Sequence, residues 1–298
     1  MRGSLPRGSY QPDPLCAGCE SFLPLYTEAV ASQLQRTTMG AMNVAYPLSG
    51  FAVGALAGLT GMGGGSVMTP LLILLFGVEP AAAVGTDLLF AAATKTTGAR
   101  VHAYRGNVDW RVVGLLAAGS VPAALVTICI ITRLPPHSHA LERAITLAIG
   151  VALLISGGAL LFSRSGERFA NKIAAAVSPR GKPALTIFLG FMLGALVSLT
   201  SVGAGAVGIV VLRHLYPQLP AVRLVGSDIA HAVPLTLLAG CGHWLIGDVQ
   251  LALLGSLLLG SIPGIYLTSR CAAHIPETIL RRGLGLVLFA IATRMLMF

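Results

Sequence analysis

Four ionisable side chains lie inside otherwise apolar stretches of this sequence: Asp87, Lys95, Asp228 and His231. A charged group at the centre of a lipid bilayer costs on the order of 3 kcal/mol even on insertion scales, so such a residue usually has a specific role. Asp228 and His231 are three residues apart, which places them on one helix face, where they could share a proton. We expect Lys95 to neutralise a bound anion, and Asp87, Asp228 and His231 to include a proton-coupling group.

A structural role would also explain these residues. Asp87 and Asp228 come two residues after Gly85 and Gly226, and each aspartate could cap the end of a helix. Lys95 could extend its ammonium group to the membrane interface. The sequence alone leaves both alternatives open.

Two clusters of small residues, at 61–66 and 200–205, are the second feature with chemical potential. Glycine lets the backbone approach a ligand closely, and Ser and Thr hydroxyls add hydrogen-bond donors. A helix that starts at such a break presents unpaired N–H groups and the positive end of its dipole to an anion. Alternatively, these small residues only let helices pack tightly. The candidate substrate-binding residues are Gly61, Gly63, Gly64, Gly65, Ser66, Thr86, Lys95, Thr200, Ser201, Gly203, Gly205 and Ser227.

The elements that position these residues are predicted to be membrane-spanning helices. Hydrophobic residues make up 55% of the chain and charged residues 10%, which is too few charges for a water-soluble surface. Residues 112–131, 144–162 and 249–267 are uncharged and long enough to cross a hydrocarbon layer of about 30 Å. We therefore expect an all-α, polytopic membrane bundle.

Each half of the chain begins with an interrupted apolar segment. Residues 44–60 precede the first small-residue cluster, and an apolar stretch then continues to Gly77. Residues 185–199 and a short run ending at Leu212 flank the second cluster. Because neither piece of a pair reaches comfortably across a membrane, we interpret each pair as a helix, a Gly-rich tip and a half-helix. Three full transmembrane helices follow each pair.

The two halves are predicted to be copies of one unit. Gly50 and Gly54 recur 140 residues later as Gly190 and Gly194. After one inserted residue the spacing becomes 141, and the matched pairs then include Asp87 with Asp228, His102 with His243, and Gly119 with Gly260. So many matches in one register indicate an internal duplication. We assign residues 1–42 to a disordered tail or to a start placed too early, with translation beginning at Met39 or Met42, 43–162 to the first repeat, 163–183 to a cytoplasmic linker and 184–298 to the second repeat.

The distribution of Lys and Arg predicts the orientation of the repeats, because cytoplasmic loops carry an excess of these residues. If each interrupted pair makes one net crossing, the two sides of the membrane receive nine and seven Lys and Arg from Met39 onward. If each pair enters and returns to its own side, the counts are thirteen and three. The second arrangement agrees better with the rule. It makes the repeats inverted, with both termini outside and the linker in the cytoplasm.

An ordered set of motifs resembles a known family. Pro70 follows the first small-residue cluster, Val-Gly-Thr stands at 84–86, and His102 precedes Arg-Gly-Asn-Val-Asp-Trp at 105–110. Over about residues 44–298 the chain resembles the sulfite exporter TauE/SafE family, also known as the toluene-sulfonate uptake permeases. The resemblance implies an inner-membrane protein that moves sulfite, organosulfonates or related sulfur-containing or carboxylate anions. The second cluster contains fewer glycines than the first, so equal roles for the two do not follow.

These features favour a secondary transporter of a small anion in the bacterial inner membrane over an enzyme. No cofactor and no metal site are expected. The basic residues lie in short clusters without interleaved aromatic residues, which argues against a nucleic-acid partner. The expected partners are a small anionic substrate and the lipid bilayer, and a homo-oligomer is left open. The alternatives are an anion channel and a transporter of a small carboxylate.

Overall fold

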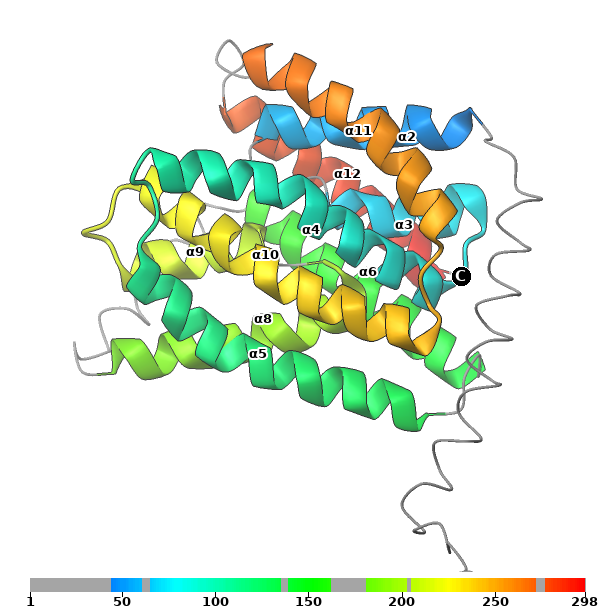
Figure 1. The fold of residues 1–298 in the computed structure, drawn as a ribbon, viewed down its shortest axis with the longest axis horizontal. Coiled ribbons are helices and arrows are strands. Elements are labelled where there is room, and N and C mark those ends of the chain that lie inside the picture. The colour runs from blue at the N-terminus through cyan, green and yellow to red at the C-terminus, as the bar shows by residue number, and fades with distance from the viewer. Residues whose placement is uncertain are drawn as a thin grey trace, which may run out of the picture. The chain divides into compact units, whose positions relative to one another are not determined.

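The computed structural model describes residues 44–60, 65–134, 139–161, 181–202, 205–271 and 277–297. They belong to one of the two compact units of the chain, Met42–Phe298. Every regular element in these ranges is an α-helix (Figure 1), which agrees with the predicted all-α class. The predicted tail, most of the predicted linker and the four candidate residues Gly61, Gly63, Gly64 and Gly203 lie outside the described residues.

The helices of the described residues form two series of five, each with a short helix in second place. The first series is α2 (Ala45–Thr60), α3 (Gly65–Phe76), α4 (Pro80–Tyr104), α5 (Trp110–Arg133) and α6 (His139–Leu161). The second series is α8 (Lys182–Thr200), α9 (Ala206–Leu215), α10 (Ala221–Ile246), α11 (Leu251–Cys271) and α12 (Glu277–Met297).

The short helices are too short to cross a membrane. At a rise of 1.5 Å per residue, the 12 residues of α3 extend about 18 Å and the 10 residues of α9 about 15 Å, against a hydrocarbon layer of about 30 Å. Five other helices, α5, α6, α8, α10 and α11, are long and apolar enough to span it. The backbone turns sharply after α8, because Ser201 adopts the left-handed conformation with a φ of 57°. We therefore describe α3 and α9 as half-helices that follow a break.

Corresponding long helices of the two series run in opposite directions. Near the start of α4, Gly85 packs against His243 at the end of α10, and near the start of α10, Gly226 packs against His102 at the end of α4. The final helices α6 and α12 are antiparallel as well. Because α3 leads into α4 and α9 leads into α10, the two half-helices enter from opposite ends of the helix bundle (Figure 1).

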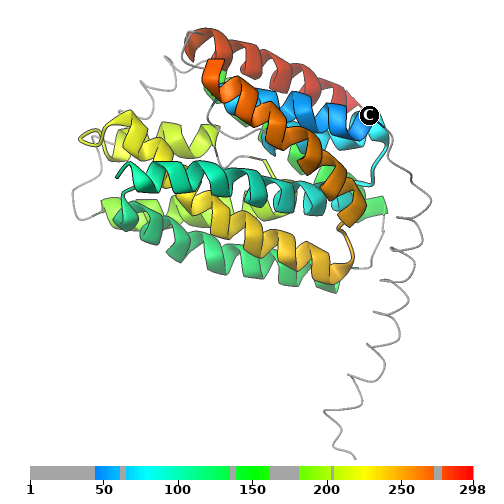
Figure 2. The ribbon, with the colours of Figure 1, turned by 45° about the horizontal axis from the view of Figure 1, so that its top comes forward.

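The first helix of each series packs against the fourth helix of the other series. The helix α2 packs against α11, and α8 packs against α5, both in parallel. Figure 2 shows α11 in orange lying across α2 in blue. A methyl group added to Gly54 on α2 would lie 2.5 Å from the carbonyl oxygen of Ser261 on α11, and Gly194 on α8 meets Ser120 on α5 in the same way. The backbones of both pairs thus touch directly, as in small-residue helix pairs of membranes.

The outer faces of the helices are apolar. Exposed side chains include Leu125, Val126 and Ile130 on α5, and Leu259 and Ile262 on α11. Soluble monomers rarely expose contiguous apolar surface of this kind, whereas lipid tails solvate it well. The outer surface is therefore suited to a bilayer.

Replacement of Gly119 by alanine tests the close packing of α5 on α8. The added methyl group would clash with the backbone of Ile187 and Phe191, which can yield only if the helices separate. We expect Gly119→Ala to destabilise the protein by about 1–3 kcal/mol or more, as overpacked cores do, and to lower its melting temperature in detergent. Gly114→Ala on the same helix is the control, because the new methyl group would meet no atom within 4 Å. Equal melting temperatures for the two variants would contradict this packing.

Candidate functional site

Two buried aspartates lie in the interior of long helices. Asp87 on α4 is fully buried, and Asp228 on α10 is 2% exposed. The helix α4 begins at Pro80 and α10 begins at Ala221, so each aspartate lies about two turns inside its helix. Helix capping, the structural alternative for both aspartates, is therefore wrong.

Each aspartate meets the opening turns of a half-helix. The Thr69 hydroxyl on α3 donates a hydrogen bond of 2.5 Å to Oδ2 of Asp87. On α9, Gly208 lies so close to Asp228 that an added methyl group would be 2.6 Å from its Oδ1. The two contacts differ in chemistry, because Asp87 receives a hydroxyl donor where Asp228 faces a residue without a side chain.

Several buried polar atoms on α4 and α10 and at the end of α8 have no hydrogen-bond partner among the described residues. They are Oδ1 of Asp87, Oδ1 of Asp228, Nδ1 of His231, and the hydroxyls of Ser198 and Ser201. Ser201 lies near the Asp87 carboxylate without completing a hydrogen bond to it. An unpaired buried polar group costs about 1–3 kcal/mol, so a set of them in one region points to a functional role.

Lys95 joins this region from α4. Its charge interacts with Asp87, with Asp228 and with His231. Among the described residues, no salt bridge ties Lys95 to either aspartate. Lys95 is thus within electrostatic range of the other three ionisable residues that the sequence singled out. We term the polar cluster the set Asp87, Lys95, Ser201, Asp228 and His231.

His231 makes its hydrogen bond to a neighbouring helix. Its Nε2 lies 2.8 Å from the hydroxyl of Ser120 on α5, and both residues are buried. Asp228, one turn earlier on α10, leaves its Oδ1 unpaired. The predicted direct sharing of a proton by Asp228 and His231 therefore has no hydrogen bond to carry it in this conformation.

The candidate binding residues Thr86 and Ser227 bond to interhelical turns. Thr86 on α4 contacts the turn after α10, and Ser227 on α10 contacts the turn after α4. The Thr86 hydroxyl accepts a hydrogen bond of 3.1 Å from the backbone N–H of Gln250. The Ser227 hydroxyl accepts one of 2.8 Å from the backbone N–H of Asp109. These hydroxyls are thus engaged at opposite ends of the α4 and α10 pair, outside the polar cluster.

The described residues of the two small-residue clusters lie where helices begin and end. Gly65 and Ser66 open α3, and Gly205 precedes α9. The Thr200 hydroxyl accepts a hydrogen bond from the backbone N–H of Val202, which secures the end of α8. Within the part of the chain that the structure describes, no group of three or more His, Cys, Asp and Glu side chains could hold a metal ion.

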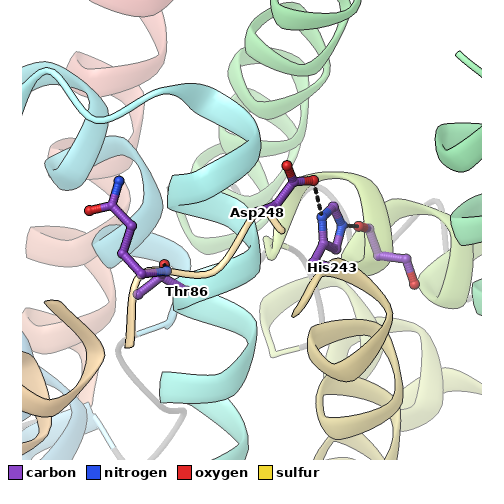
Figure 3. Close-up of polar contacts among 5 residues, drawn as sticks. Thr86, His243 and Asp248 are labelled. Carbon is purple, nitrogen blue, oxygen red and sulfur yellow. Dashed lines mark hydrogen bonds and ion pairs between the residues drawn. The ribbon is translucent and has the colours of Figure 1, made fainter. Parts of the chain in front are cut away.

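A buried histidine that the sequence analysis did not assign to the site lies at the end of α10. His243 Nδ1 is 3.2 Å from Oδ2 of Asp248 (Figure 3), and its Nε2 is 2.9 Å from the carbonyl oxygen of Ser198. Because a carbonyl oxygen can only accept, Nε2 carries a proton. Gly247, with a φ of 95°, makes the turn that returns Asp248 to the ring. The spacing of His243 and Asp248 around this glycine is the sequence signal that could have revealed the pair.

Comparison with known proteins places these features in a wider group. The profile of the family described as Sulfite exporter TauE/SafE matches residues 46–295. The "Probable membrane transporter protein YjnA" of Bacillus subtilis (strain 168) is 38% identical over 229 residues, which cover 76% of this chain and 89% of that protein. The "Probable membrane transporter protein YdhB" of the same organism is 27% identical over 253 residues, covering 83% and 97%. No solved structure gives a significant match.

Removal of the Ser120 hydroxyl tests how His231 is held. Ser120→Ala would leave both ring nitrogens of His231 buried without a partner, at a cost of about 1–3 kcal/mol. We expect a lower melting temperature of the purified protein in detergent. Ser256→Ala on α11 is the control, because that exposed hydroxyl bonds only to its own helix. Equal melting temperatures for the two variants would show that the hydrogen bond between Ser120 and His231 does not contribute to stability.

Proposed function

Since this chain belongs to the sulfite exporter TauE/SafE family, we propose that it carries a small anion, a sulfur oxyanion or organosulfonate such as sulfite, by secondary transport. Family membership and relatives named as membrane transporters make the chain a multi-pass membrane transporter and not an enzyme. The observation that carries the finer proposal is the polar cluster, where both half-helices meet buried carboxylates amid unpaired polar atoms.

An anion that enters the bilayer must exchange its water shell for protein donors. The first residues of α3 and α9 offer backbone N–H groups without helical partners, and each half-helix dipole is positive at this end. Lys95 adds a basic side chain near the same carboxylates, and its ammonium form would attract the anion. The Ser201 hydroxyl, buried without a partner, adds a further donor. These groups support an anion site between the two small-residue clusters.

Asp87 and Asp228 set a condition on anion binding. Two ionised carboxylates would repel an anion strongly in a medium of low dielectric constant. Protonation of both removes that repulsion and leaves the positive charge of Lys95 to attract the anion. The anion and protons therefore bind together and move in the same direction, with Asp87, Asp228 and His231 as the candidate proton carriers.

The antiparallel relation of the two helix series supports an inverted repeat. In transporters of this kind the substrate site lies near the midplane, and the two halves alternate in opening it. Basic side chains gather at the end of the bundle where α4 ends and α10 begins, and by the positive-inside rule we place this end in the cytoplasm. The residues concerned are Arg100, Arg105, Arg111, Lys182 and Arg223.

Uptake into proteoliposomes tests both substrate and coupling. We expect saturable uptake of sulfite or an organosulfonate, accelerated by a proton gradient directed inward, because protonated Asp87 and Asp228 admit the anion. The measurement compares labelled sulfite, thiosulfate, sulfonates and small carboxylates, with and without the gradient. Uptake without saturation or counterflow would indicate a channel, and a preference for carboxylates would reject the sulfur anion. Uptake that ignores the gradient would reject proton coupling.

Removal of single charges tests the residues themselves. We expect Asp87→Asn and Asp228→Asn to abolish the acceleration by a proton gradient, and Lys95→Ala to raise the KM of the anion about tenfold, which corresponds to ~1.4 kcal/mol. Asp109→Asn is the matched control, because Asn also caps α5 and the residue lies outside the polar cluster. Wild-type kinetics for the three cluster variants would rule out this assignment.

A further inference from the structure

We propose that His243 and Asp248 form the entrance of a proton path that leads through Ser198 and Ser201 to Asp87 and opens at one end of the bundle only. The inference rests on the proposed function, because such a path has a role only if the transporter moves protons. It concerns a histidine and an aspartate that the anion site itself does not use.

The entrance lies at the turn between α10 and α11. The Asp248 side chain is 12% exposed, whereas that of His243 is 1% exposed. Their contact of 3.2 Å, drawn as a dashed line in Figure 3, therefore joins a group that water can reach to a ring that it cannot. A proton taken up at Asp248 can pass directly to Nδ1 of His243.

The second segment of the path runs along the end of α8. The Nε2 proton of His243 already points at the carbonyl oxygen of Ser198. The hydroxyl of the same residue is buried without a partner, and so is that of Ser201, three residues further. Ser198 belongs to the last turn of α8, and Ser201 is the left-handed residue that ends it. In the proposed path, a rotation of the His243 ring moves its Nε2–H from the carbonyl to the hydroxyl of Ser198, and this hydroxyl passes a proton to that of Ser201.

The path ends at the unpaired oxygen of Asp87. Thr69 occupies Oδ2, whereas Oδ1 has no partner and Ser201 lies nearby. The proton balance is simple. His243 gains a proton at Nδ1 and loses one from Nε2, each hydroxyl accepts one proton and passes its own on, and the Asp87 carboxylate becomes a carboxylic acid.

Among the residues that the structure describes, few other charged groups could take over these steps. The titratable neighbour of His243 is Asp248, and its contacts from α8 and α4 are the Ser198 carbonyl and Gly85, which do not titrate. The charged neighbour of Asp87 is Lys95, while its α3 and α8 contacts are hydroxyls.

The corresponding positions of the first series lack this chemistry. Asn107 stands where Asp248 would be, and Gly58 and Gly61 stand in place of Ser198 and Ser201. An amide does not exchange a proton as a carboxylate does, and glycine has no hydroxyl. His102 corresponds to His243, yet its buried Nδ1 has no partner. Protons therefore reach the polar cluster from the α10 and α11 turn and not from the opposite end.

The test uses His243→Gln and Ser198→Ala in proteoliposomes, with two transport measurements. The first is anion uptake driven by a proton gradient, and the second is counterflow of the anion at equal pH. Counterflow requires only that the loaded carrier reorient with its proton still bound. We expect both variants to slow gradient-driven uptake at least about tenfold, equivalent to ~1.4 kcal/mol on the barrier, with counterflow retained. His102→Gln is the matched control and should change neither activity.

Each other outcome has a distinct meaning. Equal loss of both activities would show that His243 and Ser198 only support the structure, and unchanged gradient-driven uptake would exclude the path. Loss of gradient-driven uptake in His102→Gln would overturn its restriction to one end. If His243→Gln did not fold, Ser198→Ala would decide alone, because removing an unpaired hydroxyl leaves no polar group unsatisfied. If the proton gradient did not change anion uptake by the wild-type protein, the proposed coupling of anion to protons would itself be refuted.

Discussion

The hydrocarbon layer offers no water, so every polar group within it must be satisfied by the protein or by what the protein binds. Uninterrupted helices meet this requirement through their own hydrogen bonds. At the two breaks, the first N–H groups of α3 and α9 have no partner within their own helix, and it is against the opening turns of these helices that the structure places its buried carboxylates. The polar cluster, the antiparallel series and the direct backbone packing of the opening helices all follow from the need to keep these two breaks inside the bundle.

Much of the architecture was predictable because it depends on residue patterns within single segments of the chain. The length of the apolar segments predicted the long helices, and the small-residue clusters predicted the breaks before α3 and α9. The 140-residue spacing of Gly54 and Gly194 corresponds to two equivalent contacts, with Ser261 and with Ser120. What the pattern could not reveal is that these contacts lie between the series. A glycine in a membrane helix indicates close packing, but not which helix supplies the opposing backbone.

The ionisable residues of the polar cluster could be singled out from the sequence, but their contacts could not. Asp87 and Asp228 were open to interpretation as caps because each follows a glycine, yet Gly85 and Gly226 are packing positions inside helices that start earlier, at Pro80 for α4. The bond from His231 to Ser120 and that from His243 to Ser198 each join residues from different helices. No spacing along the chain encodes such pairs. The difference between the two helix series, with Thr69 facing one aspartate and Gly208 the other, likewise becomes visible only in three dimensions.

The exchange of opening helices between the series has a consequence for biosynthesis. As the chain leaves the ribosome, α8 finds α5 already inserted, whereas α2 must wait for α11, which is among the last helices to be made. Until then the glycine-lined face of α2 has no backbone to pack against. A nascent chain that stops after α6 thus lacks the backbone against which its own first helix packs.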